Sequence, residues 1–232
     1  MSDASEKILG IKQLPIFPLP VVLMPSELMP LHIFEERYRQ MLDDVELQKN
    51  LFGITYFNPQ ETLEEKPETG TIGCVAEISE VQKLPNGSSN ILTLGVIRYR
   101  IIEYIQTDEP YLVAEIEFFE DTEEEKSGLQ SISDEVFTLF KRVAQAAHKI
   151  SGQRGKFPDI PQAEPEQLSF LISSAFNLDN DLKYKMLETR STGERLENMR
   201  KILKKAVNRI ENSAEIHKIS LTNGHSKKKI NL

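Results

Sequence analysis

Residues Leu14 to Tyr38 read LPIFPLPVVLMPSELMPLHIFEERY, an aliphatic run broken by proline at positions 15, 18, 20, 25 and 30. Proline has no backbone N–H group, and it pushes the residue before it into extended geometry. The stretch therefore cannot form a helix. We expect it to alternate between short strands and turns while its aliphatic side chains are buried. A stiff, pre-extended segment of this kind is typical of the start of a small β-fold.

Three segments resemble the LON substrate-binding domain, the N-terminal domain of ATP-dependent Lon proteases. The first is the opening stretch, through Leu14-Pro15, Pro18-Leu19 and Met29-Pro30-Leu31. The second, Gly70 to Ile101, resembles the central hairpin of the family, and the third, Met186 to Leu203, resembles its Leu-Glu, Glu-Arg-Leu helical segment. The three follow in the family's order across nearly the whole chain. The resemblance implies a PUA-like β-rich lobe followed by a helical bundle.

Hydrophobic periodicity predicts the elements of the β-rich lobe. After a helix at Phe34 to Leu47, strands are expected where β-branched and aromatic residues cluster or apolar residues alternate with others. These strands are Leu51 to Phe57, Thr71 to Leu84, Ile91 to Ile105 and Tyr111 to Phe119. The turn at Pro85-Asn86-Gly87 joins the middle two into a long hairpin. We expect the strands to close a small, mostly antiparallel β-barrel.

The pattern changes from period two to a helical period at Glu120 to Lys126, a charged run without apolar residues. We interpret this run as the junction between a β-rich lobe at 1–120 and a helical bundle at 127–212. Limited proteolysis is expected to cut there, or in the loop Glu61 to Glu68, before it cuts the hairpin.

Capping signals divide the helical part of this α+β fold. Pro165 suits the first turn of one helix, Asp179 can cap the next, and Ser191 with Glu194 forms a capping-box pattern for the last. Amphipathicity fades near Ser213, so we expect 213–232 to be a flexible tail. The apolar stripes that define the helices comprise Ile132, Val136, Leu139, Phe140, Val143, Ala147 and Ile150, then Leu168, Leu171, Ile172 and Ala175, then Leu182, Met186 and Leu187, and finally Leu196, Met199, Leu203, Val207 and Ile210.

Charge and cysteine content indicate which partners and which cellular location to expect. Residues 1–125 carry 24 acidic and 9 basic side chains, a formal charge of −15, whereas 126–232 carry 12 acidic and 19 basic ones, a charge of +7. A lobe this acidic repels phosphate backbones, so nucleic acid is not an expected partner. The single Cys74 excludes an internal disulfide. With no signal-peptide pattern and no apolar run of 18 residues, we expect a cytoplasmic chain without membrane spans.

The sequence lacks the motifs for the ATPase and protease sites of a Lon protease. A nucleotide site needs a glycine loop followed by Lys and Ser/Thr, and the nearest string, Gly152 to Phe157, has the wrong glycine spacing and ends in Phe. A segment like the family's Ser-Lys proteolytic domain is also missing. We therefore predict no catalytic residue, no cofactor and no enzymatic activity.

Metal and nucleophile patterns are equally weak. His32 lacks a second His at zinc-ligand spacing and is expected to be a hydrogen-bonded side chain near the barrel mouth. Cys74 is expected to be a small buried apolar residue, and Arg98 and Arg100 to be exposed strand positions or partners of neighbouring Glu. The clustered carboxylates at Glu61 to Glu65 and Glu123 to Glu125 are expected to be solvated loop charges.

Two classes of function remain open. The first is a non-catalytic polypeptide-binding domain, a substrate-recognition or adaptor module in protein quality control or proteolysis that works with unfolded or tagged polypeptides and a separate protease or ATPase. Such a polypeptide could add to an exposed strand edge or enter an apolar groove between the lobes, lined by Met24, Met29 and Met186, which could equally be ordinary core residues. The alternative is an RNA- or nucleotide-binding PUA-like module, which rests on fold analogy alone.

Overall fold

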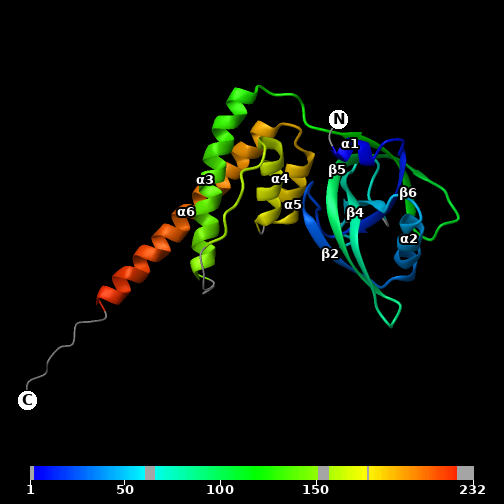
Figure 1. Cartoon of the computed structure of the whole chain (residues 1–232), viewed down its shortest axis with the longest axis horizontal. Coiled ribbons are helices and arrows are strands. Elements are labelled where there is room, and N and C mark those ends of the chain that lie inside the picture. Colours follow the sequence, from blue (N-terminus) through cyan, green and yellow to red (C-terminus); the bar gives the residue numbers. More distant parts are fainter. Residues whose placement is uncertain (1–2, 61–65, 151–156, 177, 224–232) are drawn as a thin grey trace, which may run out of the picture.

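The computed structural model describes residues 3–60, 66–150, 157–176 and 178–223 and arranges them as a β-rich part beside a helical part (Figure 1). The β-rich part contains β1 (Gln13–Leu19), β2 (Leu28–Ile33), β3 (Leu51–Tyr56), β4 (Ile72–Lys83), β5 (Ser89–Ile105) and β6 (Leu112–Phe119), with α1 (Asp3–Lys7) and α2 (Glu36–Glu46). The helical part contains α3 (Lys126–Ile150), α4 (Pro165–Ala175), α5 (Asn180–Glu188) and α6 (Thr192–Asn223).

The proline-rich stretch forms two strands, as predicted. β1 and β2 hold three of its prolines, and the connection between them turns at Ser26, whose φ is 65°. The expected strands and hairpin all form within two residues of their predicted ends, and the helix predicted at Phe34 to Leu47 is α2. The short helix α1 was not predicted, because five residues are too few to show a helical period.

The six strands form one mixed sheet in the order β2-β5-β4-β3-β1-β6, and β6 also pairs with β5. Five strands therefore pair in a closed cycle, while β2, within the part of the chain that the structure describes, pairs only with β5 and is an edge strand. Only β1 and β3 run parallel, so the mostly antiparallel pairing predicted from the sequence is confirmed.

Two apolar cores stabilise this arrangement. The smaller core draws side chains from all five strands of the closed cycle, and the larger core joins the outer face of the sheet to α2 and the helical part. Tyr99 is fully buried in the smaller core, where its hydroxyl group lies 2.5 Å from the Thr55 hydroxyl group. Gly53 and Gly73 make room for its ring, because a Cβ atom at either position would lie 2.6 Å from Tyr99 Cζ. The smaller core comprises Leu14, Ile16, Leu51, Val75, Ile97, Tyr99, Ile101, Ala114 and Ile116.

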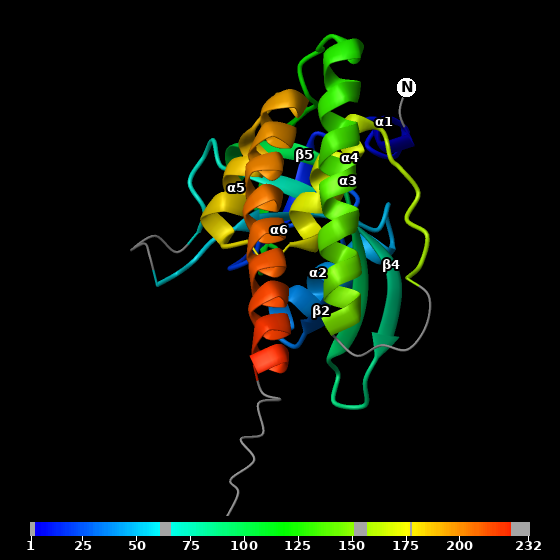
Figure 2. The ribbon, with the colours of Figure 1, turned by 90° about the vertical axis from the view of Figure 1, so that its left-hand side faces the viewer.

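In the helical part, α3 lies alongside α6, and α4 packs against both (Figure 2). The predicted caps are present: Asp179 accepts a hydrogen bond from the backbone N–H of Leu182 at 2.8 Å, and Ser191 accepts one from Glu194 at 3.0 Å. Helix α6 continues to Asn223, beyond the predicted start of the tail at Ser213. Fading amphipathicity therefore did not mark the helix end, and residues 224–232 lie outside the described range.

Candidate functional site

One edge of β2 has no strand partner among the described residues. Successive residues of a strand point their backbone groups to opposite sides, and Met29 directs its carbonyl toward β5, where it accepts a hydrogen bond from the Thr93 hydroxyl group at 2.9 Å. Leu28, Pro30 and His32 therefore direct their backbone groups away from the sheet. Their side chains are also exposed, whereas Met29 is half-buried. Pro30 in a strand fits this position, because a proline is tolerated where its missing N–H faces outward.

Large apolar side chains are exposed at both ends of this edge. Leu28, the first residue of β2, is 60% exposed, and Phe34, which follows its last residue, is 65% exposed. Each one lines a hollow. The exposure of an isolated apolar side chain is ordinary, but two that flank an unpaired strand edge form a surface suited to an apolar ligand.

The hollow beside Leu28 lies between the β-rich part and the helical part. Its volume is about 430 Å³, and apolar side chains from α3, α4 and the segment before α4 dominate its wall. Glu27 contributes the carboxylate there, and Lys183 Nζ lies 4.0 Å from it. The apolar lining residues are Leu28, Phe137, Phe140, Ile160, Pro161, Ala163, Leu168, Leu171, Ile172 and Ala175.

The hollow beside Phe34 is larger, about 980 Å³, and combines aromatic rings with cations. Phe17 and Tyr38 line it, with their ring centroids 4.0 Å apart. Arg37 lies over the Tyr38 ring at 4.6 Å and pairs with Glu35 at 2.8 Å. Arg37 and Lys66 line both this hollow and a further one of about 720 Å³.

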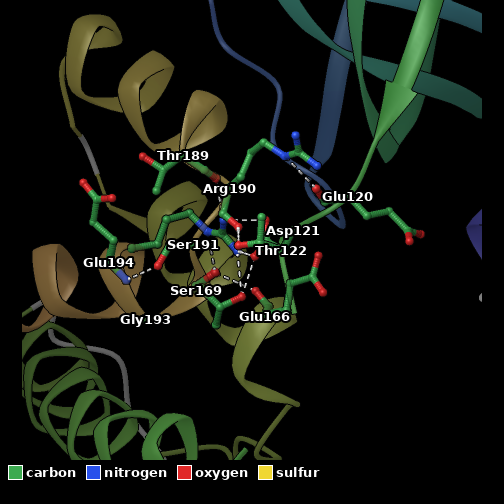
Figure 3. A network of polar contacts seen from close by, with 12 residues as sticks. Glu120, Asp121, Thr122, Glu166, Ser169, Thr189, Arg190, Ser191, Gly193 and Glu194 are labelled. Atoms are coloured by element: carbon green, nitrogen blue, oxygen red, sulfur yellow. Dashed lines mark hydrogen bonds and ion pairs between the residues drawn. The ribbon is translucent and has the colours of Figure 1, made fainter. Parts of the chain in front are cut away.

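A buried ion network holds the helical part against the sheet. Asp121, on the segment after β6, binds Arg98 of β5 at 2.5 Å and Arg195 of α6 at 2.8 Å. It also accepts a hydrogen bond from the hydroxyl group of Thr192. Figure 3 shows the surroundings of Asp121, with Thr122 and Arg190 close by. The side chains of Arg98, Asp121 and Arg195 are only 2%, 6% and 0% exposed. Because Arg98 also donates to the backbone oxygen of Thr189 at 2.8 Å, the network connects three segments that are far apart in the sequence.

One sequence-based interpretation is wrong at this network. Arg98 is buried and not an exposed strand position, although Arg100 is exposed as expected. The predicted junction at Glu120 to Lys126 is hydrogen-bonded to the helical part: Thr122 N–H donates to the Arg190 carbonyl at 2.9 Å, and the Glu124 carboxylate accepts from Gly193 N–H at 2.8 Å. We therefore expect proteolysis at this junction to be slower than the sequence alone predicts.

The network also sets the protonation of its members. Burial alone would raise the pKa of Asp121, but hydrogen bonds and charge attraction from Arg195, Thr192 and Arg98 outweigh it, so the pKa lies below its ordinary value. Burial lowers the pKa of Arg98, and attraction to Asp121 opposes this shift. Asp121 is therefore a carboxylate at neutral pH and balances charge between two buried guanidinium groups.

The methionines predicted as groove lining have different locations. Met24 and Met186 are fully buried core residues, so a polypeptide cannot touch them in this conformation. Met29 is half-buried on β2 and packs against the larger core. The binding role of these residues stays a prediction, and exposed Leu28 and Phe34 are better placed to contact a ligand. The sequence pattern placed both in the proline-rich stretch but could not show which apolar residues remain exposed.

Cys74 and His32 behave as predicted. Cys74 is fully buried, and burial raises the pKa of its thiol far above the ordinary value. His32 Nδ1 lies 2.8 Å from the Asn90 side-chain oxygen. Within the described ranges, three or more His, Cys, Asp or Glu side chains nowhere gather as a metal site would require. The string Gly152 to Phe157 falls almost entirely outside those ranges. Among the described helices, none is both long and apolar enough to span a membrane.

Comparison with known proteins decides the family. The family model for the ATP-dependent protease La (LON) substrate-binding domain matches residues 13–205. This chain belongs to that family. Three separate segments suggested a LON domain from the sequence, and the match covers all of them.

Curated relatives of this LON domain carry the name Lon protease. A Lon protease from Brevibacillus choshinensis is 28% identical over 199 residues, which are 84% of this chain and 25% of that protein. One from Heliobacterium modesticaldum is 26% identical, over 89% of this chain and 26% of that protein. The chain thus spans about a quarter of the length of these relatives.

Solved structures show the same fold. A Lon N-terminal domain protein from Xanthomonas campestris is 19% identical with a TM-score of 0.60, over 82% of this chain and 97% of that one. The N-terminal domain of the Mycobacterium avium complex Lon protease is 18% identical, also with a TM-score of 0.60, over 83% of this chain and 98% of that one. The LON resemblance predicted from the sequence is therefore confirmed.

Proposed function

We propose that this LON domain binds non-native polypeptide without catalysing a reaction, as a substrate-recognition or adaptor module for a protease or ATPase in the cytoplasm. The family description, a substrate-binding domain, supports a polypeptide ligand. The observation that carries the proposal is the open edge of β2 with Leu28 and Phe34 exposed at its ends. We also interpret the closed cycle of five strands as the barrel expected from the sequence.

An apolar polypeptide site and a nucleic-acid site differ in their response to salt. Contacts between apolar groups change little with ionic strength, whereas binding that neutralises several phosphates weakens by orders of magnitude between low and physiological salt. The acidic charge of residues 1–125 disfavours the RNA or nucleotide alternative, and the comparisons give it no support.

The test is a titration of labelled, reduced and carboxymethylated polypeptide and of labelled single-stranded RNA at two ionic strengths. We expect the polypeptide to bind with little dependence on salt and the RNA not to bind. RNA binding with a steep salt dependence, together with no polypeptide binding, would replace this proposal with the alternative.

Absence of catalysis is tested on the same preparation. No phosphate-binding loop and no nucleophile paired with a base was identified in the sequence, so we expect neither ATP hydrolysis nor casein cleavage. An activity that survives purification and disappears on a point substitution within this chain would overturn the non-catalytic part of the proposal.

A further inference from the structure

We propose that the bound segment is an extended strand of about seven residues that pairs with the free edge of β2 and places one apolar side chain in the hollow at each end. A carboxylate of the segment lies at the Phe34 end. This inference rests on the proposed polypeptide-binding function and specifies its ligand. Three features of the edge carry it, namely its backbone groups, the spacing of its hollows and its charges.

The backbone groups of β2 match an extended strand. Leu28 and His32 direct both their N–H and C=O groups away from β5. Pro30, which has no N–H, directs only its carbonyl group away from β5. No hydrogen bond from the described residues reaches these outward groups. A polypeptide in β geometry satisfies donors and acceptors at this repeat, whereas a helix satisfies its own backbone internally and a nucleic acid has no matching repeat. Pro30 removes one hydrogen-bond donor from the middle of the edge. This limits edge-to-edge pairing between β2 strands of two copies of the chain.

The spacing of the hollows sets the sequence of the ligand. Leu28 and Phe34 are six positions apart, which corresponds to roughly 20 Å at about 3.3 Å per residue. Side chains of a strand alternate between faces, so two residues reach hollows on the same face only at an even separation. We therefore expect a ligand with large apolar residues at positions i and i+6.

The two ends differ in charge, which orients the ligand. The hollow at Phe34 is lined by Arg37, which pairs with Glu35, and by Lys66, so the described lining residues carry an excess of one cation there. The hollow at Leu28 instead has the Glu27 carboxylate, with Lys183 Nζ 4.0 Å from it, and no cation in excess among its described lining residues. Because residues 1–125 are strongly acidic as a whole, an acidic ligand residue is favourable only beside this local excess of cations. A carboxylate next to the apolar residue at the Phe34 end is therefore complementary to the surface.

The probes are fluorescent 11-residue peptides of Thr, Ser and Gly with two Phe residues at i and i+6 or at i and i+5. A Glu beside either Phe tests the charge preference, and N-methylation of alternate residues tests backbone pairing. We expect the i+6 peptide to bind about tenfold more tightly than the i+5 peptide, because only the first fills both hollows. N-methylation should weaken binding only at every second peptide residue, namely those whose N–H groups face β2. One placement of Glu should bind more tightly than the other.

Variants of the intact chain locate the site. Leu28→Ser and Phe34→Ser should each weaken the i+6 peptide about tenfold. The matched control is Leu47→Ser, since Leu47 is 87% exposed and lies away from β2 at the end of α2. Far-ultraviolet circular dichroism is used to check that each variant is folded. We expect all three to fold, because each replaced side chain is largely exposed.

The outcomes separate this inference from the function on which it rests. If carboxymethylated polypeptide binds but the peptides show no dependence on spacing, the position of N-methylation or the β2 variants, the edge site is wrong and the polypeptide-binding function stands. If Glu at either end binds equally, the charge argument is wrong. If neither the long polypeptide nor any peptide binds, the proposed function itself fails.

Discussion

Replacing Asp121 with Asn should destabilise the whole domain. The substitution keeps the shape of the side chain but removes its charge, so Arg98 and Arg195 remain buried side by side without the carboxylate that binds both of them. Removing one partner of a buried ion pair costs about 3–5 kcal/mol, because the remaining charge is left without solvation. A domain of this size loses roughly 2–4 °C of Tm per kcal/mol, so we expect Tm to fall by about 6–20 °C.

Urea unfolding followed by circular dichroism measures this loss directly. The exposed Asp108 serves as the matched control, and Asp108→Asn should change the free energy of unfolding by less than about 0.5 kcal/mol. Arg98→Met combined with Asp121→Asn should cost less than the sum of the two single changes, because the double variant removes one unpaired charge. A loss of under about 1 kcal/mol for Asp121→Asn alone would refute the argument that this carboxylate balances two buried cations.

The network also predicts how stability depends on pH. The folded-state pKa of Asp121 is depressed, so the carboxylate stabilises the fold fully above its unfolded-state pKa of about 3.9, and this contribution is lost as pH falls through the lower folded-state value. Glu166 works in the opposite direction, because burial and then repulsion by Asp121 raise its pKa. We expect acid unfolding below about pH 4 to be shallower in Asp121→Asn than in the wild type.

Three further predictions concern single positions. The thiol of Cys74 is fully buried with a raised pKa, so it should resist Ellman's reagent in the native state and react with one equivalent in 6 M guanidinium, about the strength used for full unfolding. Gly73→Ala places a Cβ atom against the Tyr99 ring and should cost about 1–3 kcal/mol in urea unfolding. Ser191→Ala removes the cap of α6 and should cost about 1 kcal/mol in the same assay.

Local chemistry determined most of the secondary structure of this LON domain. Proline excluded a helix from the opening stretch, alternation of apolar residues located β4 to β6, and the caps at Asp179 and Ser191 located the starts of α5 and α6. These features act within a few residues, so they can be read from the sequence alone. The continuation of α6 past Ser213 was missed, because the prediction used fading amphipathicity alone and no capping signal or break occurs at Ser213.

Tertiary structure alone decided the buried network and the exposed surface. Arg98 and Asp121 are ordinary charged residues of a strand and a loop in the sequence, and they become buried partners only where α6 packs against them and Arg195 contacts Asp121 as well. Likewise, Met24 and Leu28 are both apolar residues of the same stretch, yet one is fully buried and the other is exposed. Burial depends on which distant segments pack over a residue, and in this chain the pairing of β2 with β5 alone leaves the edge where we place the ligand.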